Sequence, residues 1–103
     1  MRNLLALMAF VVAPAAVGAE RDDAALQHLV RHDCGSCHGM QLTGGLGPAL
    51  TVQALAPRPV EWVRAVILEG VPGTAMPGWR GLMSETEAGR IAHLLKERIH
   101  ENR

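Results

Sequence analysis

The stretch Cys34-Gly35-Ser36-Cys37-His38 decides how the rest of this 103-residue chain is organised. Two cysteines three positions apart, with a histidine directly after the second, are the pattern of a covalent attachment site for a c-type haem. The two thiols can add to the two vinyl groups on one edge of the porphyrin. The histidine can then reach the iron from the same side. The motif therefore predicts one covalently attached haem c, with His38 as an axial ligand of its iron.

The first 19 residues have the pattern of a secretory signal peptide. Arg2 gives a positive start, an unbroken apolar run covers residues 4–12, and Val17-Gly18-Ala19 supplies small residues before a cleavage site. The apolar run is shorter than the roughly 20 residues that span a bilayer, so an uncleaved membrane anchor is the less favoured alternative. We expect cleavage after Ala19, export to an oxidising periplasm, and a single small domain at 20–103 with no membrane attachment.

This domain is nearly neutral and poor in aromatic residues. The chain has 10 basic and 10 acidic residues, and loss of Arg2 with the leader leaves nine basic against ten acidic. Nucleic-acid binding needs clustered excess positive charge, so no nucleic-acid partner is expected. Only two tryptophans remain as aromatics once Phe10 is removed. Small domains often need a cofactor to complete their core, and a buried haem would supply this apolar bulk.

Helical spacing and capping signals predict an all-α fold, and no strand pattern is present. Asp22 or Asp23 can cap the first helix, Pro59 can begin the middle one, and Ser84-Glu85-Thr86-Glu87 is a capping box that begins the last. Met83 can pack on Ala88 beside that box. The expected helical segments are 22–32, a short turn at 51–55, 59–69 and 84–100.

Two irregular stretches separate these helices. Residues 39–51 have Gly44-Gly45-Leu46-Gly47-Pro48 at their centre, and the glycines permit close backbone approach to something flat. Their spacing fits neither the dinucleotide-binding fingerprint nor a P-loop, so phosphate binding is not expected. Residues 70–83 contain six glycines and prolines, which exclude a regular element there.

A six-coordinate haem needs a second ligand opposite His38, and Met76 is the preferred candidate. Met40 follows His38 too closely to cross to the other face, and Met83 is better used in helix packing. Met76 lies in a loop with no helix to bury it, and methionine–histidine ligation is common in electron-transfer cytochromes. If Met76 does not bind, a histidine or an open iron position becomes the alternative. The remaining histidines, expected at the surface, are His28, His32, His93 and His100.

In this order, Cys34–His38, Gly47-Pro48 and Met76-Pro77 make the chain similar to class I cytochromes c over the whole of residues 20–103. More narrowly, CGSCHGMQLTGGLGPALT and GVPGTAMPGWRGLMSETEAGRIAHLL resemble the small c55X-type cytochromes, which are associated with the haem-d nitrite reductases of denitrifying bacteria. The resemblance implies the class I cytochrome c fold, in which the first and last helices cross beside the haem.

The resemblance also implies roles for other residues near the haem. It implies that the Pro48 carbonyl accepts a hydrogen bond from the ring N–H of His38, a contact that would orient the ring. Class I cytochromes usually have an aromatic residue in the last helix where it crosses the first, but residues 84–103 contain none. Leu94 or Leu95 is expected to fill that contact. The implied neighbours of the haem propionates are Trp79, Arg58 and Arg80.

These residues predict a periplasmic one-electron carrier with no catalytic residue. By resemblance, the expected partner is a nitrite reductase or an enzyme that matures its haem d. The near-zero net charge predicts a small, weak contact with that partner, and a monomer is expected. Two other classes stay open. A haem enzyme or sensor would need an open iron position in place of Met76. A thiol–disulfide protein would use Cys34 and Cys37, but would need strands around them.

Overall fold

The computed structural model describes residues 8–12 and 20–97, and these form helices and loops with no strand. The all-α prediction is therefore confirmed for the described part of the chain. The elements are α1 (Asp23–Leu29), the π-helical turn η1 (Val30–Cys34), α2 (Gly35–His38), α3 (Val52–Leu55), α4 (Val60–Glu69) and α5 (Glu85–Glu97).

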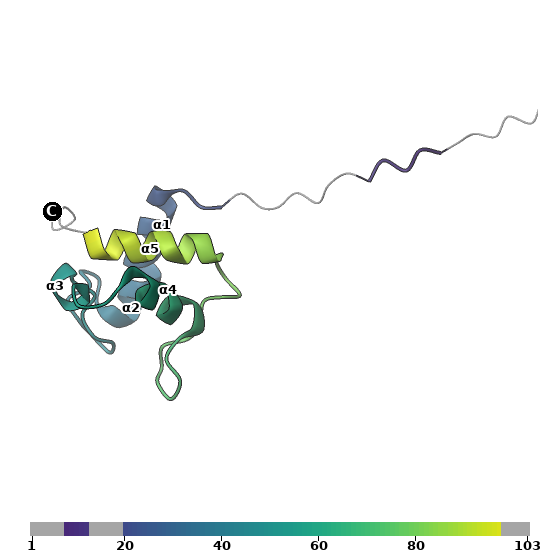
Figure 1. The fold of residues 1–103 in the computed structure, drawn as a ribbon. Coiled ribbons are helices and arrows are strands. Elements are labelled where there is room, and N and C mark those ends of the chain that lie inside the picture. The colour runs from purple at the N-terminus through teal and green to yellow at the C-terminus, as the bar shows by residue number, and fades with distance from the viewer. Residues whose placement is uncertain (1–7, 13–19, 98–103) are drawn as a thin grey trace, which may run out of the picture.

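Helix α5 is the central element of the fold. It contacts α1, α3 and α4, and α1 crosses it in Figure 1. The loop between α4 and α5 extends away from the helices at the bottom of the same view. The crossing of the first and last helices is the arrangement that the class I cytochrome c fold requires.

The first helical segment begins where the sequence predicts and runs further. Asp22 caps α1, because its side chain accepts a hydrogen bond from the N–H of Ala25 at 2.9 Å. The chain then stays helical through η1 and α2 to His38, so the predicted end near His32 is wrong. Gly39 ends the helical path, because its φ of 92° is not a helical value. Other residues rarely adopt such a φ, so a glycine suits this position.

The two middle segments follow the prediction closely. Thr51 caps α3, since its hydroxyl oxygen accepts a hydrogen bond from the N–H of Ala54 at 3.1 Å. The sequence predicts Pro59 as the first residue of the middle helix. It has an extended backbone and occupies the N-cap position of α4, which begins one residue later, at Val60. Gly70 ends α4 with a φ of 70°, as predicted.

The start of α5 has the predicted capping box. The N–H of Ser84 donates to Glu87 Oε1 at 3.0 Å, and the N–H of Glu87 donates to Ser84 Oγ at 3.0 Å. Met83 and Ala88 are both buried in the core, which agrees with the predicted packing at this end. The predicted end of the helix near His100 lies outside the described residues.

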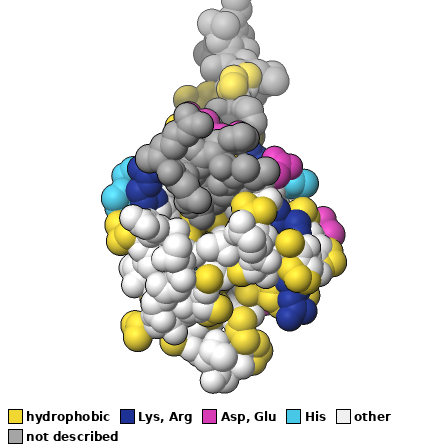
Figure 2. Space-filling model, turned by 90° about the vertical axis from the view of Figure 1, so that its left-hand side faces the viewer, with side chains coloured by type: hydrophobic (Ala, Val, Ile, Leu, Met, Phe, Trp, Pro, Cys, Tyr) yellow, Lys and Arg dark blue, Asp and Glu magenta, His cyan; other side chains and the backbone are white. Residues whose placement is uncertain are grey.

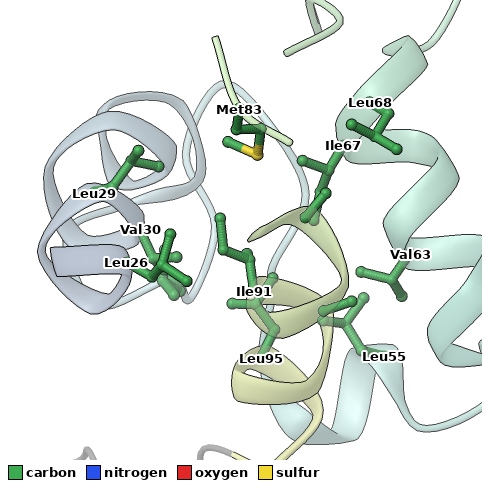
Figure 3. Packing of buried hydrophobic residues seen from close by; sticks show 13 residues of the cluster. Leu26, Leu29, Val30, Leu55, Val63, Ile67, Leu68, Met83, Ile91 and Leu95 are labelled. Atoms are coloured by element: carbon green, nitrogen blue, oxygen red, sulfur yellow. The ribbon is translucent and has the colours of Figure 1, made fainter. Parts of the chain in front are cut away.

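Side chains from α1, α4 and α5 form one hydrophobic core. In Figure 3, Ile91 and Leu95 of α5 lie between α1 on one side and α3 and α4 on the other. Leu95 is buried and Leu94 packs against the cluster. Leucines therefore pack in the part of the last helix where class I cytochromes usually have an aromatic residue. The buried members are Leu26, Leu29, Val30, Leu42, Leu55, Val63, Ile67, Leu68, Met83, Ala88, Ile91, Ala92 and Leu95.

Residues 8–12 lie apart from the helices in Figure 1, and their apolar side chains, including Phe10, are exposed. They belong to the segment for which the sequence predicts a signal peptide, and that assignment stays a prediction. Among the described helices, none combines the length and the apolar character needed to cross a membrane.

Candidate haem site

The imidazole of His38 is buried at the end of α2 and held by one backbone oxygen. Its Nδ1 lies 2.7 Å from the carbonyl oxygen of Pro48. Because a carbonyl only accepts, the ring carries its proton on Nδ1 and donates it to Pro48. The other ring nitrogen, Nε2, then has a free lone pair for a metal ion. This is the contact between His38 and Pro48 that the family resemblance implies.

The glycine-rich loop folds back over the attachment motif. The N–H of Gly47 donates to the Cys37 carbonyl at 2.8 Å, and the N–H of Gly44 donates to the His38 carbonyl at 2.9 Å. A Cβ atom at Gly47 would lie 2.7 Å from two atoms of the His38 ring, which is closer than Cβ atoms approach in proteins. The glycines therefore do allow a close approach to a flat group, and the group seen beside Gly47 is the imidazole.

The two cysteines of the motif lie in different surroundings and form no disulfide with each other. Cys34 is half-buried and packs against the core, whereas Cys37 is exposed. Burial, with a smaller effect of the Asp33 carboxylate, raises the pKa of the Cys34 thiol to about 11.

Met76 and Trp79 lie on the loop between α4 and α5. Two backbone hydrogen bonds fix the loop to the end of α4. The N–H of Trp79 donates to the carbonyl of Ile67 at 2.9 Å, and the N–H of Arg80 donates to the carbonyl of Leu68 at 3.1 Å. Met76 is half-buried, and its carbonyl accepts from the N–H of Val71 at 3.2 Å. Trp79 is half-buried against the core. Among the described residues, no hydrogen bond joins this loop to the attachment motif.

The two arginines implied as neighbours of the haem propionates have other partners. The guanidinium of Arg80 makes ion pairs with Glu69 and Glu85. The guanidinium of Arg58 lies 4.5 Å from the centre of the Trp62 ring, as in a cation–π contact. A propionate contact stays a prediction for both arginines and for Trp79.

The residues of the motif fit a covalently attached haem. Two free thiols stand one helical turn apart, and a buried imidazole beside them has one nitrogen fixed by a carbonyl and the other available to a metal. Exposed hydrophobic side chains occur on both loops, as expected where an apolar cofactor is bound. In the lower half of the face in Figure 2, hydrophobic side chains lie among white atoms, which belong to the backbone and to other uncharged side chains. The exposed large hydrophobic residues of the domain are Met40, Leu46, Trp62, Val71 and Leu82.

Known proteins match this chain over nearly all of the described domain. Residues 21–95 match the family described as cytochrome c oxidase, cbb3-type, subunit III. The chain is also 55% identical over 96 residues to a cytochrome c55X of Paracoccus denitrificans, a match that covers 89% of this chain and 93% of the relative. The chain belongs to the cytochrome c55X family.

Solved structures agree with this membership. The c-type cytochrome NirC superposes with a TM-score of 0.73 at 50% identity, covering 77% of this chain and 96% of that chain. A third match, found by sequence, is to part of a larger protein, the dihydro-heme d1 dehydrogenase of Pseudomonas aeruginosa. It is 34% identical over 77 residues, which cover 75% of this chain and 16% of that relative.

As a member of the c55X family, the chain is a small class I c-type cytochrome. It carries covalently bound haem c with iron, and it is an electron-transfer protein, not an enzyme. The thiol–disulfide alternative does not fit this membership, because the family carries covalently bound haem c.

Proposed function

We propose that this c55X cytochrome is a one-electron carrier whose haem is attached through Cys34 and Cys37, with His38 and Met76 as axial ligands. The haem, when bound, supplies reversible one-electron chemistry at iron. The observation that carries this proposal is the buried His38 imidazole with Nδ1 fixed on Pro48. That contact sets the tautomer and ring orientation that leave Nε2 for the metal.

The other residues of the site hold and cover this arrangement. Gly47 allows the loop backbone to pack against the ring of His38, so that the ring has little room to rotate. The hydrogen bonds of Trp79 and Arg80 to α4 fix the base of the loop that carries Met76. Trp79 would then stand close to the haem edge.

The ligand assignment is tested on the protein matured in a host that attaches haem. A pyridine haemochrome spectrum should report one c-type haem per chain, and the ferric protein should show the charge-transfer band of methionine-ligated iron. Absence of that band, with ready binding of carbon monoxide to the ferrous protein, would favour a haem sensor or enzyme with an open iron position over a carrier.

The carrier is proposed to work in the periplasm as a monomer. Residues 1–19 would be removed as a signal peptide, leaving residues 20–103 as the cytochrome domain. Intact-mass measurement of the protein isolated from the periplasm checks this directly. A mature chain that begins at Glu20 and carries one haem is the expected result, and a retained leader would contradict it.

The proposed pathway is denitrification, with electron delivery to a nitrite reductase. The names of the relatives support this choice: c55X, NirC and dihydro-heme d1 dehydrogenase. The last of these supports a second candidate as well. A segment like this chain occurs inside a dihydro-heme d1 dehydrogenase, so electron transfer during maturation of the haem d cofactor is the alternative role.

Stopped-flow measurements separate the two roles. The reduced cytochrome is mixed with oxidised nitrite reductase, and the oxidised cytochrome with dihydro-heme d1 dehydrogenase during turnover. Rapid oxidation by the nitrite reductase is the expected result, with an unrelated c-type cytochrome of similar potential as the control. Exchange with the dehydrogenase alone would favour the maturation role.

A further inference from the structure

Two histidines outside the haem site lie next to each other on the helix that leads to it. His28 is in the last turn of α1 and His32 is in η1, four positions later. Their ring centroids are 4.2 Å apart, and both side chains are exposed. Neither ring has a hydrogen-bond partner within the described part of the chain, and neither takes part in the proposed electron transfer.

This separation is close to the one that two imidazoles have when they bind the same metal ion. With metal–nitrogen distances of about 2.0 Å and ligands at right angles, the ring centroids are roughly 4.5 Å apart. The helix backbone therefore already brings the rings together at the required spacing. Metal binding would require side-chain rotations that turn one nitrogen of each ring toward a common point.

We propose that His28 and His32 form a surface site for a divalent late transition-metal ion, with water in the remaining positions. Imidazole nitrogens suit Cu²⁺, Ni²⁺ and Zn²⁺, and Cu²⁺ binds most tightly to a given set of nitrogen ligands. Arg31 and Asp33 flank His32 with opposite charges, so the local charge does not oppose a cation.

The site has two protein ligands, which limits its affinity. Within the described residues, no group of three or more histidine, cysteine or acidic side chains is placed to hold a metal. The ion would connect α1 to the π-helical turn that ends at Cys34, because one ligand lies on each side of that junction. Its binding should therefore favour the folded helix over the unfolded chain.

The experiment titrates Cu²⁺ into the mature haem-containing protein, kept in the ferric state so that copper is not reduced. Calorimetry should show one saturable Cu²⁺ site per chain, and this site should bind Cu²⁺ more tightly than Zn²⁺. His28→Asn and His32→Asn should each weaken Cu²⁺ binding at least tenfold. His93→Asn is the matched control, because His93 is a single exposed histidine on α5, and it should leave the affinity unchanged.

Thermal unfolding gives a second readout that non-specific binding would not produce. Cu²⁺ should raise the melting temperature of the parent protein and of His93→Asn, and should not raise that of His32→Asn. Equal Cu²⁺ affinity in all variants, or binding to the parent with no rise in melting temperature, would overturn the proposal. In either case the two rings would be a stacked surface pair only.

Discussion

At the residue scale, Met76, the proposed second axial ligand, would decide whether the iron has six ligands. Met76→Ala should leave the haem attached, since Cys34 and Cys37 are unchanged. It should lower the reduction potential, because a thioether ligand favours ferrous iron. It should also allow carbon monoxide to bind the ferrous protein. Potentiometry and a carbon monoxide titration measure both effects. Met40→Ala, at an exposed position, is the control and should change neither. An unaltered potential and spectrum in Met76→Ala would disprove the ligand assignment.

Gly47 provides a second residue-scale test, which concerns the packing of the loop on His38, the other proposed axial ligand. Gly47→Ala should destabilise the protein by about 1–3 kcal/mol, because the new Cβ would lie 2.7 Å from the His38 ring and force the ring or the loop to move. Denaturant unfolding of the haem-containing protein measures this change. Gly81→Ala is the matched control, since no atom lies within 4 Å of its added Cβ. Equal stability of the two variants would rule out close packing on the ring.

At the element scale, the start of α5 makes stability depend on pH through Glu87. The N–H of Ser84, followed by contacts from Arg21, holds the pKa of Glu87 below its usual range, against the opposing effect of burial. Because the pKa of Glu87 is lower in the folded state than in the unfolded state, its carboxylate contributes to the free energy of unfolding. This contribution is complete above about pH 4.3 and is lost as the pH falls further.

Glu87→Gln tests this dependence. The variant should be less stable than the parent at neutral pH, and its melting temperature should fall less steeply between about pH 5 and pH 3, so that the two curves converge in acid. Glu61→Gln is the control, because Glu61 is exposed on α4 and forms an ion pair with Arg64 on the same helix. Parallel curves for Glu87→Gln and the parent would show that the capping box carries no pH-dependent stability.

Elements with explicit capping signals could be predicted from sequence, and those without them could not. Ser84 and Gly70 mark the boundaries of α5 and α4 through local chemistry that acts within a few residues. The continuation from α1 through η1 to His38 has no such signal. Its π-turn, in which the Gly35 N–H donates to Val30, inserts a residue that periodicity in the sequence does not show.

The same distinction applies to the candidate site. The spacing of Cys34–His38 identifies the attachment motif, since the chemistry of the haem edge fixes that spacing. The role of Gly47 depends on the folding of one loop over the His38 ring, so the glycine-rich sequence predicts a close approach without naming its target. The partners of Arg58 and Arg80 depend on neighbouring surface side chains, which a family resemblance does not specify.

At the scale of the whole molecule, α5 connects the other elements through polar contacts as well as through the core. Lys96 Nζ donates to the carbonyl of Leu55 at the end of α3, at 3.0 Å. At the other end of α5, Glu87 pairs with Arg21, and Arg90 pairs with Asp23 at the start of α1. Several charged side chains of the first and last helices therefore form ion pairs within the molecule.

This internal matching and the near-zero net charge determine how the carrier should meet its partner. With nine basic and ten acidic residues in 20–103, the molecule has no strong long-range field to steer an encounter. The second-order rate constant for electron transfer to the proposed partner, a nitrite reductase, should therefore change by less than about threefold between roughly 10 and 200 mM salt. Stopped-flow measurements across this range test the prediction. A steep fall with salt would reveal a concentrated charged docking face, and a rise would indicate that like charges meet at the contact.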